Sequence, residues 1–107
     1  MSLSAAWLYL LIAGALEILW ASGLKWTQGF SRLGPTALVL GVMGVSIYCL
    51  AQAVKVLPIG TAYAVWTGIG AAGTVIAGLL FFHEPVQAGK MVCVFLIIAG
   101  VVGLRFL

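Results

Sequence analysis

Charged residues are scarce in this chain. Only 7% of its 107 residues are Asp, Glu, Lys or Arg, whereas 64% are hydrophobic. A soluble domain carries about 25% charged residues, so most of this surface is not built to face water. The five basic residues leave a net charge of +3. They are too few and too scattered to form a nucleic-acid-binding surface.

The chain also lacks the residue clusters that metal sites and enzymes require. It has one histidine and two cysteines, and Cys49 and Cys93 both stand within apolar runs. No Cys/His group has the spacing of metal ligands, and no Ser/His/Asp or Cys/His set is available for nucleophilic catalysis. We therefore predict no metal, no cofactor and no enzymatic activity.

Long apolar segments are what the chain has instead. Four of them follow one another, at about residues 3–24, 35–54, 58–82 and 85–106. Each can cross the ~30 Å hydrocarbon core as a helix, which takes ~20 residues. Prolines stand at the start of the last three segments, where a missing N–H costs least. The sequence predicts an all-α, multi-pass membrane protein with four transmembrane helices in a single domain, residues 1–107.

The connections between these segments are short. The longest, KWTQGFSRLG from Lys25 to Gly34, is polar enough for a turn and too short for a domain. A site outside the bilayer therefore has no room. Any function has to be built inside the helix bundle.

Glycines and other small residues mark two helix faces. A G-x-G-x-x-G pattern runs through Gly68, Gly70 and Gly73. A dinucleotide site would need a preceding strand and an acidic residue about 20 positions later, and neither is present. We interpret the glycines as a packing face or hinge. In the fourth segment Ala99 and Gly103 form a small-xxx-small pair suited to helix association.

The basic residues are spread almost evenly over the two ends of the predicted helices. With four spans, the end that holds both chain termini carries Lys55 and Arg105, and the opposite end carries Lys25, Arg32 and Lys90. A bias in such charges is what fixes orientation. The near balance is either simply a weak signal or the mark of a chain that inserts both ways and pairs as an antiparallel homodimer. Such a dimer would supply the inverted repeat that many transporters encode in one longer chain.

Glu17 is the most informative residue, because it is a lone carboxylate within an apolar segment. It lies about 18 Å along the helix from Ala5, near the bilayer midplane. An ionisable group there costs ~2.5–3.5 kcal/mol and usually faces the bundle interior or a water-filled cavity. No basic residue stands mid-span to pair with it, so its natural ligands are a proton or a cation. The alternative is a protonated Glu17 that only hydrogen-bonds a neighbouring helix.

The residues around this carboxylate are suited to a pocket. Gly14 and Trp20 lie on its face of the helix. Gly14 leaves room, and Trp20 offers an indole N–H and a π face for a cation. Tyr63 and Trp66 provide further donors and rings in the third segment, and Ser46 is a mid-span hydroxyl in the second. Packing alone would explain the aromatic residues, but beside an unpaired carboxylate they favour a pocket.

Two stretches, AGALEILWASGLKWTQGFSRL and LPIGTAYAVWTGIGAAG, carry a resemblance to a known family. They resemble the small multidrug resistance family of bacterial transporters, and the likeness covers nearly the whole chain. The LEILW and TAYAVWTG runs look like its guanidinium-exporter subtype rather than the subtype that expels bulky aromatic cations. The resemblance implies an antiparallel dual-topology homodimer that exports guanidinium across the bacterial inner membrane in exchange for protons.

The same resemblance implies roles for individual residues. Glu17 would be the shared site of proton and substrate, with Gly14 giving its carboxylate space. The residues that would line the pocket or hold the carboxylate are Trp20, Ser46, Tyr63 and Trp66. The third-helix glycines resemble the family's hinge. Guanidinium has paired N–H donors that match the two carboxylate oxygens, and protonation of Glu17 removes the charge, so proton and substrate would displace each other.

Two other functions stay open. The first is export of hydrophobic quaternary ammonium cations, which suits cation–π recognition by Trp20 and Trp66. The second is a structural or accessory membrane subunit without transport of its own. An ion channel is not favoured, because neither a ring of charges nor a carbonyl filter is visible.

Overall fold

The protein consists of helices alone. The computed structural model describes all residues, 1–107. Its elements are α1 (Leu3–Gly23), a 3₁₀ turn η1 (Leu24–Thr27), α2 (Leu33–Ala53), α3 (Ile59–Phe81) and α4 (Ala88–Phe106). All four α-helices are long and apolar enough to cross a membrane. The prediction of an all-α chain with four candidate transmembrane helices is confirmed.

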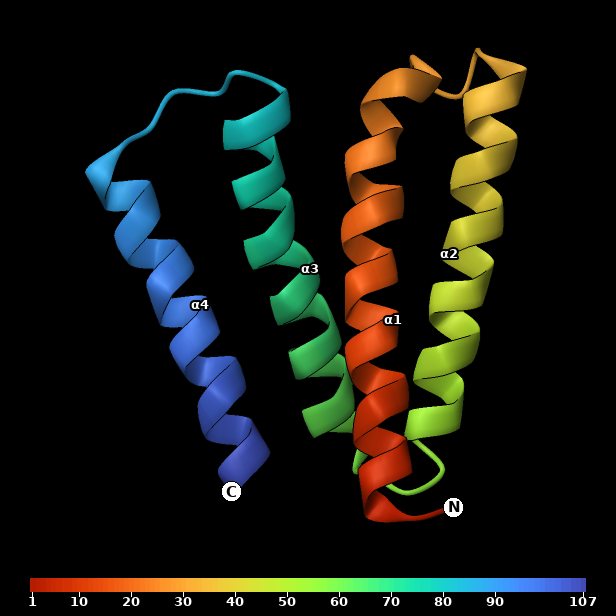
Figure 1. Ribbon diagram of the computed structural model, residues 1–107, viewed down its shortest axis with the longest axis vertical. Coiled ribbons are helices and arrows are strands. Elements are labelled where there is room, and N and C mark those ends of the chain that lie inside the picture. Colours follow the sequence, from red (N-terminus) through yellow and green to blue (C-terminus); the bar gives the residue numbers. More distant parts are fainter.

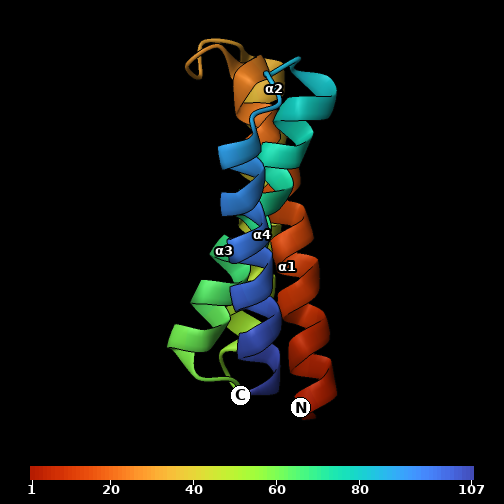
Figure 2. The ribbon, with the colours of Figure 1, turned by 90° about the vertical axis from the view of Figure 1, so that its left-hand side faces the viewer.

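The helices lie side by side in the order α4, α3, α1, α2 (Figure 1). α1 packs against α2 and α3, whereas the backbone of α4 comes close to α3 alone. The molecule measures 39 × 36 × 17 Å. A helix with its side chains is about 10–12 Å across, so the assembly is little more than one helix thick, as the edge view shows (Figure 2). No helix is enclosed by the other three.

Both chain termini and the connection from α2 to α3 lie at the same end of the layer (Figure 1). The other two connections lie at the opposite end. This topology places Lys55 and Arg105 at one end, as the charge count from the sequence assumed. The remaining basic residues, Lys25, Arg32 and Lys90, belong to the other end.

The buried core is small and sits near the N-terminus. It joins the first half of α1 to the end of α2 and the first turns of α3, through Ala6, Leu10, Ala53, Leu57, Ala62 and Val65. Only 17 of the 107 residues are buried. Large apolar side chains such as Leu38 and Phe95 cover the outside instead. Lipid tails are as apolar as these side chains, so this surface is suited to a bilayer.

Aromatic rings and cations meet at both ends of the helices. At one end the Phe82 ring lies 5.1 Å from the ring of Trp26 and 5.6 Å from Lys25 Nζ. At the other end the Arg105 guanidinium lies 4.9 Å from the centre of the Trp7 ring. Such groups are typical of the membrane–water interface. At one end of the layer they connect η1, which follows α1, to the end of α3. At the other end they connect α1 to α4.

The fourth helix begins at Ala88, three residues later than the predicted start at Pro85. The chain first folds back over the end of α3, because the backbone N–H of Glu84 donates to Gly78 O at 3.2 Å. His83 turns the chain with a positive φ of 55°. The residue before a proline is also disfavoured in a helix. The chain therefore crosses to α4 without helical structure.

The other boundaries differ by small steps. α2 begins at Leu33, before the predicted residue 35, so Pro35 lies inside its first turn, where proline is tolerated. The first span continues past residue 24 through η1. The Thr27 hydroxyl ends this turn by donating to Leu24 O at 2.7 Å and accepting from the Phe30 N–H at 3.3 Å.

Candidate functional site

Glu17 projects from the seam where α1 meets both of its neighbours. Ala13, one turn before it, contacts α2, and Gly14 contacts α3. The Glu17 carboxylate rests against Gly70 of α3, where an added Cβ would come within 2.5 Å of Oε1. The position of this carboxylate therefore requires a residue without a side chain at position 70.

Gly14 has a different neighbour from the one that the sequence suggested. A Cβ at Gly14 would lie 2.8 Å from Cγ2 of Ile69, and its three nearest atoms all belong to that side chain. Gly14 therefore lets α1 and α3 approach each other. Gly70, which the sequence analysis had placed in a packing face or hinge, also leaves space beside Glu17.

Two buried polar atoms at this seam have no hydrogen-bond partner. They are Oε2 of Glu17 and Nε1 of Trp20, on residues three apart and hence on one helix face. Leaving a buried polar group unpaired costs about 1–3 kcal/mol. Oε2 requires a donor, which a proton or a cation with N–H groups supplies. The Trp20 indole requires an acceptor, and a carboxylate one turn away is suited to that role.

Ser46 ties α2 to both α1 and α3. Its buried hydroxyl donates to Ala13 O at 2.7 Å and accepts from Trp66 Nε1 at 3.1 Å. The carbonyl of Ala13 is also the one that pairs with the Glu17 N–H in an α-helix. The Ser46 bridge therefore fixes the backbone that holds the carboxylate, and it brings Trp66 to the same level of the layer.

Tyr63 and Trp66 lie together on α3. Their ring centres are 5.7 Å apart at an angle of 53°. Tyr63 is more than half exposed, while the Trp66 indole is held by Ser46. The two rings therefore belong to the same face of α3, and the Tyr63 ring is exposed on the surface of the layer.

The predicted packing residues divide into three groups. Gly68 faces α4, where a Cβ would lie 2.6 Å from Val101 Cγ2. Gly73 receives the Ile18 side chain of α1. Ala99 and Gly103 of α4 contact no other helix of this chain: Ala99 is exposed, and no atom lies within 4 Å of a Cβ built on Gly103. That face of α4 is open.

Thr74 is a residue that the sequence analysis missed. Its hydroxyl is buried and has no hydrogen-bond partner. It stands four residues after Gly70 and so continues the face formed by Tyr63, Trp66 and Gly70. This spacing could have identified it from the sequence.

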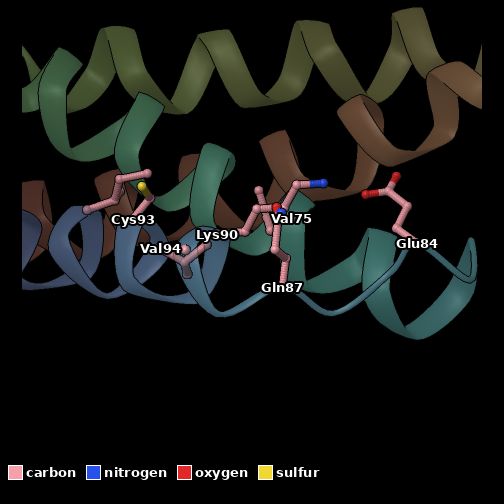
Figure 3. A pocket seen from close by; sticks show the side chains of 8 residues that line it. Val75, Glu84, Gln87, Lys90, Cys93 and Val94 are labelled. Atoms are coloured by element: carbon pink, nitrogen blue, oxygen red, sulfur yellow. The ribbon is translucent and has the colours of Figure 1, made fainter.

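A cavity of about 600 Å³ lies apart from Glu17, between α3 and α4 (Figure 3). Glu84 and Lys90 line it together with apolar residues such as Val94. Both charged side chains are exposed, and none of the buried unpartnered polar atoms belongs to its lining. The five buried polar atoms without partners belong to Glu17, Trp20, Ser22, Thr36 and Thr74. Glu17 is the only ionisable residue among them, and we take its surroundings as the candidate site.

Comparisons with known proteins identify relatives of nearly the whole chain. The family described as Small Multidrug Resistance protein matches residues 5–97. A guanidinium exporter of Yersinia pseudotuberculosis is 51% identical over 100 residues, which cover 94% of this chain and 96% of the relative. A guanidinium exporter of Citrobacter freundii is 50% identical over 100 residues, covering 94% and 95% of the two chains.

Both the matched family and the relatives extend over nearly the full set of helices. The match begins within α1 and reaches into α4, so it includes Glu17 and every residue of the candidate pocket. It also agrees with the prediction of a transporter in place of an enzyme. The chain therefore belongs to the small multidrug resistance family of membrane transporters.

Proposed function

We propose that this protein exports guanidinium and small substituted guanidines across the bacterial inner membrane in exchange for protons. The observation that carries the proposal is that the Glu17 carboxylate is isolated among apolar residues and lacks a hydrogen-bond donor. It is the only acidic residue within the four helices, and its buried Oε2 has no donor. The curated relatives that are half identical to the chain are named guanidinium exporters, which supports this choice of cargo.

The chemistry of the cargo fits the site. Guanidinium is planar and presents paired N–H groups, so it can engage both oxygens of one carboxylate. Its flat face can also stack on an aromatic ring, and Trp66 lies at the level of Ser46 beside the seam. A cation of this kind supplies the donor that Glu17 lacks within the chain.

Proton coupling follows from competition for Glu17. A protonated carboxyl has no charge to hold the cation, so proton and guanidinium displace each other. If the protein changes access only when one of them is bound, an inward proton gradient drives guanidinium out. Gly68, Gly70 and Gly73 are the proposed hinge that lets α3 bend between the two access states.

We further propose that two copies pair in antiparallel orientation. The chain forms a single layer 17 Å thick, and the open face of α4 at Ala99 and Gly103 is free to contact a second copy. The nearly equal numbers of basic residues at the two ends support insertion in both orientations. The second copy would then complete a pocket that one layer only half forms.

Transport in proteoliposomes tests the proposal, with the chain's other carboxylate as the matched control. Glu17→Gln keeps the size of the side chain but replaces the titratable carboxyl group with an amide that cannot ionise. We expect it to abolish guanidinium-driven proton movement, whereas Glu84→Gln should transport like the wild type. Coupled transport by Glu17→Gln would contradict the proposal. A wild type without any guanidinium-driven proton movement would favour an accessory subunit.

A second candidate is export of hydrophobic quaternary ammonium cations. The exposed Tyr63 ring and its contact with Trp66 favour it, because aromatic faces attract cations without needing N–H donors. Guanidinium and tetraphenylphosphonium compared side by side on purified protein discriminate the two functions. Faster transport of tetraphenylphosphonium would replace the first candidate with the second.

A further inference from the structure

We propose that Thr74 is a further residue of the Glu17 site and determines its specificity. Its hydroxyl accepts a hydrogen bond from an N–H group of the bound cation, so the site selects cations that carry such groups over quaternary ammonium ions. The inference rests on the proposed function and adds to it a residue that separates two classes of cation.

The first observation is that the Thr74 hydroxyl is free. Within a helix, threonine usually bonds back to the carbonyl three or four residues before it. Thr67 of the same helix does so, donating to Tyr63 O at 2.9 Å and lying 3.3 Å from Ala64 O. The Thr74 hydroxyl is buried and makes no such bond. The local backbone therefore does not account for its presence.

The second observation is its position. Gly70, which contacts the Glu17 carboxylate, lies one turn before Thr74 on the same face of α3. α1 and α3 run side by side in the same direction (Figure 1). One turn along α3 from Gly70 therefore corresponds to one turn along α1 from Glu17, the level of Trp20. Three buried polar groups without partners, on Glu17, Trp20 and Thr74, thus fall within one helical turn.

The third step concerns what the cation requires. A carboxylate can engage two N–H groups of guanidinium, and the others need further acceptors. Ser46 has used its only donor on Ala13 and one of its two lone pairs on Trp66, so it can accept at most one further N–H group. A threonine hydroxyl offers two acceptor lone pairs and one donor. It can therefore accept from an N–H group of the cation.

A quaternary ammonium ion has no N–H group and gains nothing from this hydroxyl. Binding sites built to hydrogen-bond a ligand reject analogues that leave their buried polar groups unpaired. Thr74 therefore works against the cations that the aromatic rings would otherwise admit. The carboxylate attracts both classes of cation through its charge. The hydroxyl adds a hydrogen bond that only cations with N–H groups can make.

The test replaces the hydroxyl and keeps the shape. Thr74→Val retains the branched side chain, and Thr67→Val is the matched control on the same helix. Dissociation constants for guanidinium and tetraethylammonium are measured by titration calorimetry on the purified full-length protein. We expect Thr74→Val to weaken guanidinium binding about tenfold and to leave tetraethylammonium unchanged or tighter. Thr67→Val should match the wild type for both cations.

Thr74→Ser, which returns the hydroxyl, should restore guanidinium binding and shows that the loss is not one of folding. Unchanged guanidinium binding in Thr74→Val, or an equal loss for both cations, would overturn the inference while the proposed function stands. A wild type that binds no guanidinium would remove both. The two failures are therefore distinguishable from the wild-type titration alone.

Discussion

Glu17 and Gly70 form a matched pair across two helices. The carboxylate occupies the space that any side chain on residue 70 would fill. Interiors are packed closely enough that even one methyl group is felt. The geometry of the site therefore depends on a residue that has no functional group of its own.

Gly70→Ala should disturb the site more than the fold. The added Cβ collides with Glu17, and overpacking of this kind costs typically 1–3 kcal/mol. We expect guanidinium binding to weaken by about 5- to 150-fold, measured by titration calorimetry on protein that still elutes as the wild-type assembly. Gly41→Ala on α2, where no atom lies within 4 Å, should bind normally. Wild-type affinity in Gly70→Ala would mean that the carboxylate does not depend on this space.

At the level of single residues, the sequence singled out the carboxylate but not its contact with Gly70. Glu17 stands out because nothing else in its segment is ionisable. Its contact with Gly70 joins residues far apart in the chain, and this contact depends on how α1 and α3 align along their length. The contact of Gly14 with Ile69 is hidden from the sequence for the same reason: spacing along one helix shows which residues share a face, but not which neighbouring side chain lies against it.

At the level of elements, α4 is the helix with the fewest ties. Its backbone lies beside α3 alone, and only Val94 of its residues is buried. Gly68 allows the approach of Val101, while Arg105 reaches Trp7 of α1 near the other end. The position of α4 therefore rests on one close helix contact and one cation–ring contact.

Gly68→Ala should loosen this contact. The new Cβ would overlap Val101, so α4 has to move away from α3 or the side chain has to shift. We expect the free energy of unfolding, measured by titration with a denaturing detergent, to fall by about 1–3 kcal/mol. Gly100→Ala on α4, where nothing lies within 4 Å, is the control. If the two variants unfold at the same detergent concentration, Gly68 is not a packing contact.

The helices themselves were accessible from the sequence, because apolar length alone predicts a span. Their ends were less so. Pro85 was predicted to start a helix, yet the chain first bonds back to Gly78. The local sequence gives no sign of this contact between segments. The 3₁₀ extension through Thr27 depends in the same way on one hydroxyl that bonds to both sides of a turn.

At the level of the whole molecule, the nearly equal numbers of basic residues at the two ends have a consequence for orientation in the membrane. If orientation is not fixed, a tag on the C-terminus should be found on both sides of the membrane, because both orientations insert with similar ease. Accessibility of the tag to a membrane-impermeant protease, in intact and in opened cells, measures this. Finding the tag on one side only would exclude dual insertion.

A matched pair of variants sharpens the measurement. Added lysines beside Lys55 should push all chains into one orientation, and added lysines beside Arg32 should push them into the other. Under the proposed pairing, each variant alone would lose transport. Expressed together, the two variants should regain it. Full transport by either variant alone would show that parallel copies suffice.

The single-layer shape of the chain has a further consequence for how such a protein can evolve. If two identical layers in opposite orientation complete one pocket, every substitution enters the pocket twice, once from each side of the membrane. The inward-open and outward-open forms are then the same object seen from opposite directions, and their energies are equal by symmetry. Selection can then change how tightly the protein holds its cargo, but it cannot favour one direction, which is set by the gradients across the membrane.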